Sequence, residues 1–129
     1  MNGYALAAGV LTLVAFAAHA IVGAQEFRLF RPVSSAEKPR TSWVQGLAGW
    51  HWVSVDLLGA AVVLLLIGLT DWLPDEGTVL MVVSGYFALT GSAWLATLVV
   101  SGGDVPNRYL RLGQWLFCFT VAALAWIAR

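Results

Sequence analysis

Residues 43–69 decide the fold of this chain, and they read WVQGLAGWHWVSVDLLGAAVVLLLIGL. His51 and Asp56 are the two ionisable groups in this stretch, and no proline interrupts it. A hydrocarbon core of about 30 Å needs about 20 residues of apolar helix, because each residue adds about 1.5 Å along the axis. In lipid, such a segment must satisfy its own backbone hydrogen bonds. The stretch is therefore predicted to be a transmembrane helix.

Three further stretches have similar length and apolarity, and they take up most of the remaining chain. They cover residues 4–24, 79–100 and 109–128, in a chain of 129 residues with 60% hydrophobic and 11% charged residues. Asp104 and Pro106 fit the cap and first turn of the last helix. We predict a single domain, residues 1–129, that forms an all-α, integral membrane four-helix bundle of up-down-up-down topology. Its helices are expected at about residues 4–24, 43–69, 79–100 and 106–128.

The first apolar stretch is predicted to be a retained helix and not a cleaved signal peptide. A signal peptide begins with basic residues, whereas the first basic residue here is Arg28. Cys118 is the one cysteine, which excludes an intramolecular disulfide and a C-x-x-C redox site. The formal net charge is zero, so no nucleic-acid partner is expected.

The distribution of basic residues predicts the orientation in the membrane. Six of the seven Lys and Arg residues lie in or beside the first and third loops, whereas residues 71–76 carry three acids and no base. Loops rich in Lys and Arg stay in the cytoplasm. We expect an integral protein of a bacterial inner membrane with both termini on the non-cytoplasmic side.

Two histidines are predicted at similar depth on the first two helices. His19 lies roughly 7 Å and His51 roughly 12 Å below the cytoplasmic boundary, at about 1.5 Å per residue. Imidazole is a ligand of zinc, copper and iron, including haem iron. His19 and His51 are therefore candidate ligands of a haem or a transition metal, with Trp50, Trp52 and Gln114 as candidate cofactor contacts. A quinone site fits the same residues, and structural hydrogen bonding is the alternative role of the histidines.

Asp56 is predicted near the middle of the bilayer, about 20 Å from the start of its helix. Ionisable groups at that depth are costly and are candidates for function. One interpretation is a protonated acid that joins helices through a hydrogen bond. The other is a site for proton or ion coupling. The candidate polar partners on the third and fourth helices are Tyr86, Thr90, Ser92, Gln114 and Cys118.

Three classes of function remain for such a chain. The first is an accessory or assembly subunit of a larger membrane complex, favoured by small residues suited to helix packing and by the lack of a soluble domain. The second is a small oligomeric proton-coupled transporter or channel that uses Asp56. An independent enzyme has the least support, because no nucleophile–base spacing, metal-hydrolase motif or phosphate loop is present. The expected partners are the lipid bilayer and other membrane subunits or further copies of this chain.

Overall fold

The computed structural model describes residues 1–33, 36–101 and 107–129, and within these ranges it contains helices and no strands. The chain begins with a continuous helical segment whose middle turn is a π-helix, η1. The elements are α1 (Gly3–Ala17), η1 (Ala18–Gly23), α2 (Ala24–Arg28), α3 (Glu37–Leu69), α4 (Glu76–Val100), α5 (Arg108–Arg111) and α6 (Gln114–Ala128).

Three of the helical segments are long and apolar enough to cross a membrane. They are Gly3–Arg28, Glu37–Leu69 and Glu76–Val100, as the sequence predicts. The fourth, α6, is apolar but has 15 residues, which gives about 22 Å of helix and falls short of the roughly 30 Å of hydrocarbon. The protein thus has three helical segments that could cross a membrane and a last apolar helix that is shorter than predicted.

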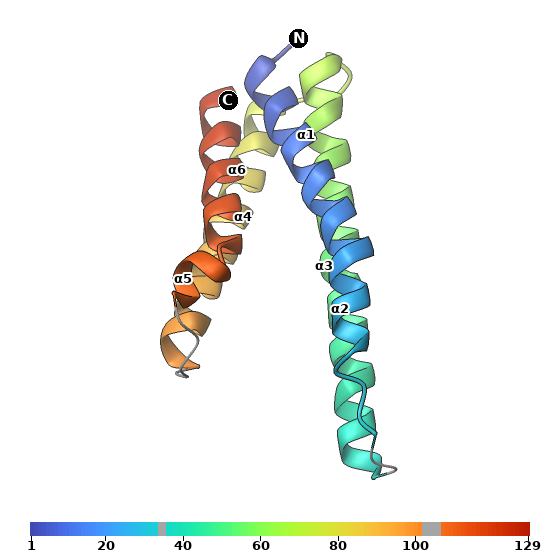
Figure 1. Ribbon diagram of the computed structural model, residues 1–129. Helices are drawn as coiled ribbons and strands as arrows, with labels where there is room; N and C mark the ends of the chain where they lie inside the picture. The colour runs from blue at the N-terminus through green and yellow to red at the C-terminus, as the bar shows by residue number, and fades with distance from the viewer. Residues whose placement is uncertain (34–35, 102–106) are drawn as a thin grey trace.

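The helices form two antiparallel pairs that diverge from one end of the molecule (Figure 1). We call α1, η1, α2 and α3 the long arm, and α4, α5 and α6 the short arm. Both termini and the connection between α3 and α4 lie at the end where the arms meet, the closed end. The helices alternate in direction as predicted, but the four come together only at the closed end. The predicted bundle is therefore present in part.

Small residues bring the helices together at the closed end. A Cβ added to Gly68 of α3 would lie 2.7 Å from the Cα of Leu6, and one added to Gly9 would lie 2.9 Å from the backbone nitrogen of Leu65. Backbones this close are typical of small-residue packing between membrane helices. The buried core that surrounds this contact consists of Ala5, Ala8, Leu64, Ile67, Leu80, Phe87, Cys118, Val121, Ala122 and Ala125.

Asn2 connects three helices at the closed end. Its side-chain oxygen accepts a hydrogen bond from the amide of Ala5 and so caps α1. Its side-chain nitrogen donates to the carbonyl of Ala128 at 2.6 Å, and its backbone amide donates to the carbonyl of Gly68 at 3.1 Å. The last two carbonyls lie at the ends of α6 and α3, where helical partners are lacking.

The predicted fourth helix is interrupted between α5 and α6, at residues 112–113. Glycine has a low preference for helix interiors, and the turn leaves carbonyls without helical partners. Two indole groups satisfy these carbonyls: Trp94 donates to Leu112 and Trp115 donates to Tyr109, both at 2.9 Å. The expected cap and proline at residues 104 and 106 lie outside the described residues.

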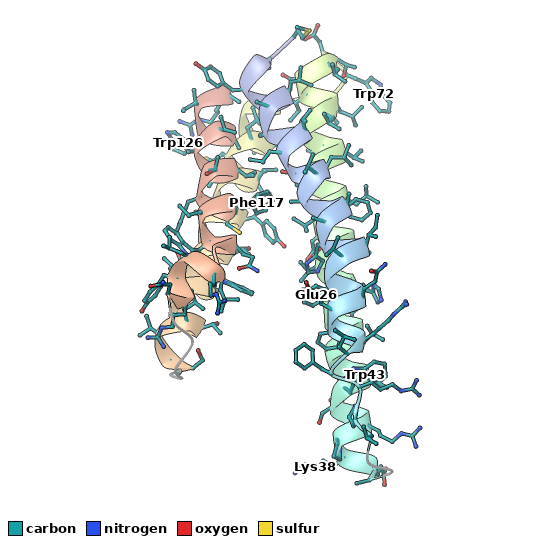
Figure 2. The ribbon with its side chains drawn as sticks, viewed as in Figure 1. Glu26, Lys38, Trp43, Trp72, Phe117 and Trp126 are labelled. Atoms are coloured by element: carbon teal, nitrogen blue, oxygen red, sulfur yellow. The ribbon has the colours of Figure 1, made fainter. Side chains whose placement is uncertain are left out.

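Of the other helices, α3 and α4 begin earlier than predicted, and the first helical segment continues to Arg28 instead of ending at residue 24. Helix α3 begins at Glu37, six residues before Trp43, and includes Pro39 in its first turn, where a missing amide proton costs little. Figure 2 shows Trp72 and Trp126 near the closed end, with Trp43 and then Lys38 toward the far end of α3. Tryptophans near both ends of the helices are typical of the membrane–water interfaces.

Candidate functional site

His19 lies in the π-helical turn η1 and packs against Trp50 of α3. The two rings stack with centroids 4.1 Å apart and an angle of 8° between their planes. The Nε2 atom of His19 lies 3.1 Å from the carbonyl oxygen of Trp50, and the indole Nε1 of Trp50 donates to the carbonyl of His19 at 3.2 Å. Two hydrogen bonds and one ring stack therefore join α3 to the π-helical turn, a type of turn that is frequent at functional sites.

Glycines provide the space for this aromatic contact. A Cβ on Gly23 would overlap the indole of Trp50, and one on Gly46 would lie 3.0 Å from the ring of Phe27. The ring of Phe27 in turn lies 5.5 Å from that of Trp50 and 6.5 Å from that of Trp43. These rings fill the interior of the long arm away from the closed end.

The contact defines which nitrogen of His19 is free. A carbonyl can only accept, so Nε2 of His19 must carry the proton that it shares with Trp50. In a neutral ring, Nδ1 is then the one nitrogen with a free lone pair. Any ligand of His19 would therefore bind Nδ1, on a ring that Trp50 already covers on one face.

His51 lies apart from this contact. It is exposed, and it follows Trp50 by one residue, which turns its side chain about 100° around α3. Within the described residues His51 has no hydrogen bond or ring contact, and no group of three metal-ligating side chains occurs. The structure thus pairs His19 with Trp50, and joint ligation of a haem or metal by both histidines stays a prediction.

The other candidate cofactor contacts lie away from His19. Trp52 is 72% exposed on α3. Gln114 is exposed at the first position of α6, in the short arm, whereas His19 and His51 belong to the long arm. Among the candidate cofactor contacts, the structure places Trp50 against His19.

Asp56 forms a hydrogen bond between the two arms. The hydroxyl of Tyr86 on α4 donates to Oδ2 of Asp56 on α3 at 3.2 Å. The candidate partners Thr90 and Ser92 instead donate to carbonyls of their own helix, those of Tyr86 and Ala88. Both Asp56 and Tyr86 are exposed, so the pair lies on the surface where the arms diverge.

Two glycines leave open space beside this pair. Gly59 lies one turn after Asp56, and Gly85 directly precedes Tyr86. A Cβ added to either would meet no atom within 4 Å. Small side chains around an exposed carboxyl group allow another helix to approach its backbone closely.

Sequence reasoning missed two structural roles. Trp50, a predicted cofactor contact, also stacks on His19, and the sequence signal for this contact is a glycine, Gly23, at the depth of a large ring. Asn2 was not singled out, although asparagine directly before an apolar helix is a common cap.

Comparisons with protein-family models, with curated proteins and with solved structures found no match to this chain.

Proposed function

We propose that this protein is an accessory subunit of a membrane complex, and that it binds a transmembrane helix of a partner on the surface between its two arms. The observation that supports the proposal is the exposed pair of Asp56 and Tyr86, joined at 3.2 Å where α3 and α4 diverge.

The depth of this pair makes its exposure costly in lipid. Asp56 lies 13 residues before the end of α3, and Tyr86 lies 10 residues after the start of α4. At about 1.5 Å per residue, both lie roughly 15–20 Å from the closed end. A carboxyl group at that depth costs about 2.5–3.5 kcal/mol on insertion scales. Contact with a partner helix would remove it from the acyl chains.

The surroundings of the pair suit a helix more than a small ligand. The open backbone at Gly59 and Gly85 lets a second helix come close. A partner with Ser, Thr, Asn or Gln at the contact could bond the free oxygen of Asp56, because such side chains join helices in membranes. With the predicted orientation, the arms would open toward the cytoplasm.

A proton-coupled role is the second candidate, because the same hydrogen bond would hold a titrating carboxyl group beside a proton donor. In that role the chain works as an oligomer, and Asp56 must lose and regain a proton. Asp56→Asn separates the two functions, since an amide can still form hydrogen bonds but cannot carry the proton.

Site-specific photo-crosslinking in native membranes tests the helix-binding proposal. A photoreactive residue at Ala93 lies two turns after Tyr86 on the same face, and one at Ser92 lies about 100° around α4. Both positions are exposed. We expect a discrete crosslink to one membrane protein from Ala93 and none from Ser92. The crosslink should persist in Asp56→Asn and disappear in Asp56→Leu, which keeps the apolar surface but removes the polar contact.

Other results would contradict the proposal that a partner helix binds between the arms. Equal diffuse labelling of lipid from both positions would show that this surface faces the bilayer. A crosslink from Ala93 to a second copy of the chain would favour the oligomeric transporter. Proton flux into liposomes that is lost in Asp56→Asn would then assign the coupling role to Asp56.

A further inference from the structure

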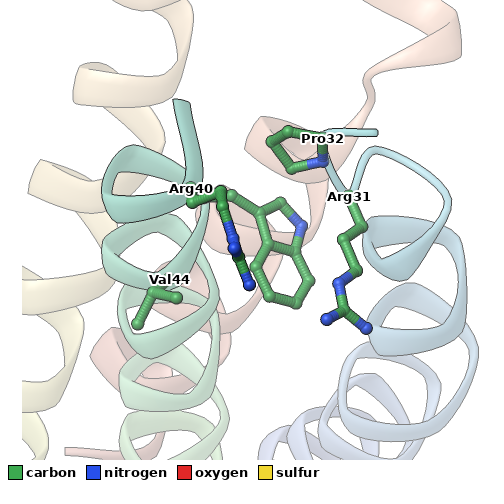
Figure 3. Close-up of a pocket in the computed structure, with 5 residues that line it drawn as sticks. Arg31, Pro32, Arg40 and Val44 are labelled. Atoms are coloured by element: carbon green, nitrogen blue, oxygen red, sulfur yellow. The ribbon is translucent and has the colours of Figure 1, made fainter. Parts of the chain in front are cut away.

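A small basic pocket lies at the end of the long arm, far from the closed end. It is lined by Arg31, Pro32, Arg40, Trp43 and Val44, and its volume is about 80 Å³. Figure 3 shows Arg31 and Arg40 on opposite sides of the pocket, one from the segment after α2 and the other from the start of α3, with their guanidinium groups extending in the same direction. Two segments that are adjacent in space thus supply two cations to one hollow.

These cations are available for a ligand. Arg31 and Arg40 are exposed, and within the described residues neither guanidinium group has an ion pair or a hydrogen bond. The guanidinium carbon of Arg31 lies 5.6 Å from the centre of the Trp43 ring, which fixes one wall of the pocket by a cation–π contact. The pocket is therefore positively charged and lacks an anion of its own.

Trp43 contributes a donor that also lacks a partner. Its indole Nε1 is buried and has no acceptor within the described residues. A buried donor without an acceptor is unusual in a folded protein, because its desolvation is not compensated. An oxygen-rich anion held between the two arginines would supply the missing acceptor.

The pocket lies where a lipid headgroup would be. The apolar run of α3 begins at Trp43, and tryptophans mark the interface between acyl chains and water. Arginine binds phosphate with paired, planar hydrogen bonds, and basic pockets beside transmembrane helices bind anionic headgroups. A volume of about 80 Å³ fits a phosphate group, since a water molecule takes about 30 Å³ in the liquid.

We propose that Arg31, Arg40 and Trp43 form a binding site for the phosphate group of an anionic phospholipid. The arginines neutralise the phosphate, the indole N–H donates to one of its oxygens, and Val44 and Pro32 contact the apolar part of the headgroup. The acyl chains then extend along the outside of the long arm.

Native mass spectrometry of the full chain in a neutral detergent tests this site. The delipidated protein is titrated with phosphatidylglycerol or with phosphatidylcholine at about 0.15 M salt, where exposed charges are screened beyond about 8 Å. We expect phosphatidylglycerol to bind at least about tenfold more tightly. Arg31→Gln and Arg40→Gln should each weaken it about fivefold, and the double variant about 25-fold, which corresponds to about 1 kcal/mol per basic residue.

Lys38→Gln is the matched control, because it removes one charge from the same end of α3 without altering the pocket lining. It should change the affinity less than about twofold, since an exposed charge outside the pocket is screened. Trp43→Phe keeps the ring but removes the N–H, and we expect a loss of about threefold, within the range of one hydrogen bond. Circular dichroism and thermal unfolding check that each variant is folded.

Three outcomes would overturn the proposal. Equal binding of the two lipids, or an equal loss in Lys38→Gln and Arg31→Gln, would show general attraction to a charged surface. A second arm adds glycerol phosphate as a soluble competitor. If it displaces the lipid at an equal concentration, the ligand is a free phosphate ester and the lipid is not the source.

Discussion

The helices of the long arm and those of the short arm are held together by different contacts. In the long arm, backbones touch at Gly9 and Gly68 near the closed end, and rings pack into Gly23 and Gly46 farther along. In the short arm, Gly91 packs on Cys118, and the hydroxyl of Ser84 donates to the carbonyl of Ala122 at 2.8 Å. Farther from the closed end, α6 stops at Gln114, and a turn separates it from α5.

This difference shows how one rule of packing serves two purposes. A glycine opposite a backbone lets helices approach, whereas a glycine opposite a ring makes room for a large side chain. The long arm uses both and stays paired along its length. In the short arm, Gly91 instead lies against the side chains of Cys118 and Phe119. The surface of this arm beside Tyr86 stays exposed.

The largest expected effect comes from Gly68→Ala. The new Cβ would lie 2.7 Å from the backbone of Leu6, which cannot move aside as a flexible side chain can. We expect the free energy of unfolding to fall by about 2–3 kcal/mol, in the upper range for overpacking. Unfolding in mixed micelles with increasing dodecyl sulfate, followed by tryptophan fluorescence, measures it.

Gly59→Ala is the matched control on the same helix, because its Cβ would meet no atom within 4 Å. Its stability should stay within about 1 kcal/mol of the parent, the difference in helix preference between Gly and Ala. Equal losses in the two variants would show that the closed end is not packed as described.

A smaller effect is expected from His19→Ala, farther along the long arm. The change removes the ring stack on Trp50 and one hydrogen bond. Together these contribute about 1–2 kcal/mol. His51→Ala, in an exposed position, should change the unfolding free energy by less than about 0.5 kcal/mol.

The absorbance spectrum of the same two variants tests the predicted cofactor site. A haem held by both histidines would give a Soret band that either substitution removes. Because His19 is bonded to Trp50 and His51 is exposed, we expect His19→Ala and His51→Ala to lower the unfolding free energy by different amounts. An equal loss of a haem band in both would instead support joint ligation.

The smallest effect is expected from Ser84→Ala in the short arm. Its hydroxyl makes a buried hydrogen bond to the neighbouring helix, and such bonds contribute about 0.6 kcal/mol in membranes. In Ser92→Ala, the lost hydroxyl bonds a carbonyl of its own helix, so no change in the stability of the pair is expected. Unfolding of both variants in the same micelles distinguishes an interhelical bond from a local one.

The sequence predicted the helical class and three of the spans, because long apolar runs leave few alternatives in lipid. It also placed Tyr86 among the candidate partners of Asp56, because both lie at similar depth. These predictions depend on distances along the helix axis, which residue numbers give directly.

What the sequence could not predict depends on rotation around the axis and on local breaks. The direction of His51 differs from that of Trp50 by about 100°, and the π-helical turn at residues 18–23 shifts the register of the first helix. The break at Gly113 depends on the indole groups of Trp94 and Trp115. Trp94 lies on another helix, and Trp115 donates back to Tyr109 on the other side of the break, so residue spacing alone does not indicate either contact.

The unequal lengths of the helices have a consequence for the surrounding bilayer. The apolar part of α3, residues 43–69, extends about 40 Å, and α6 about 22 Å. A span longer than the hydrocarbon tilts, and a shorter one thins the bilayer beside it. In a bilayer with about 30 Å of hydrocarbon, α3 would therefore tilt, whereas α6 would thin the bilayer beside it although its neighbour α4 is long enough to cross. The long and short arms would thus respond differently to a change in membrane thickness, because each contains a helix of a different mismatch.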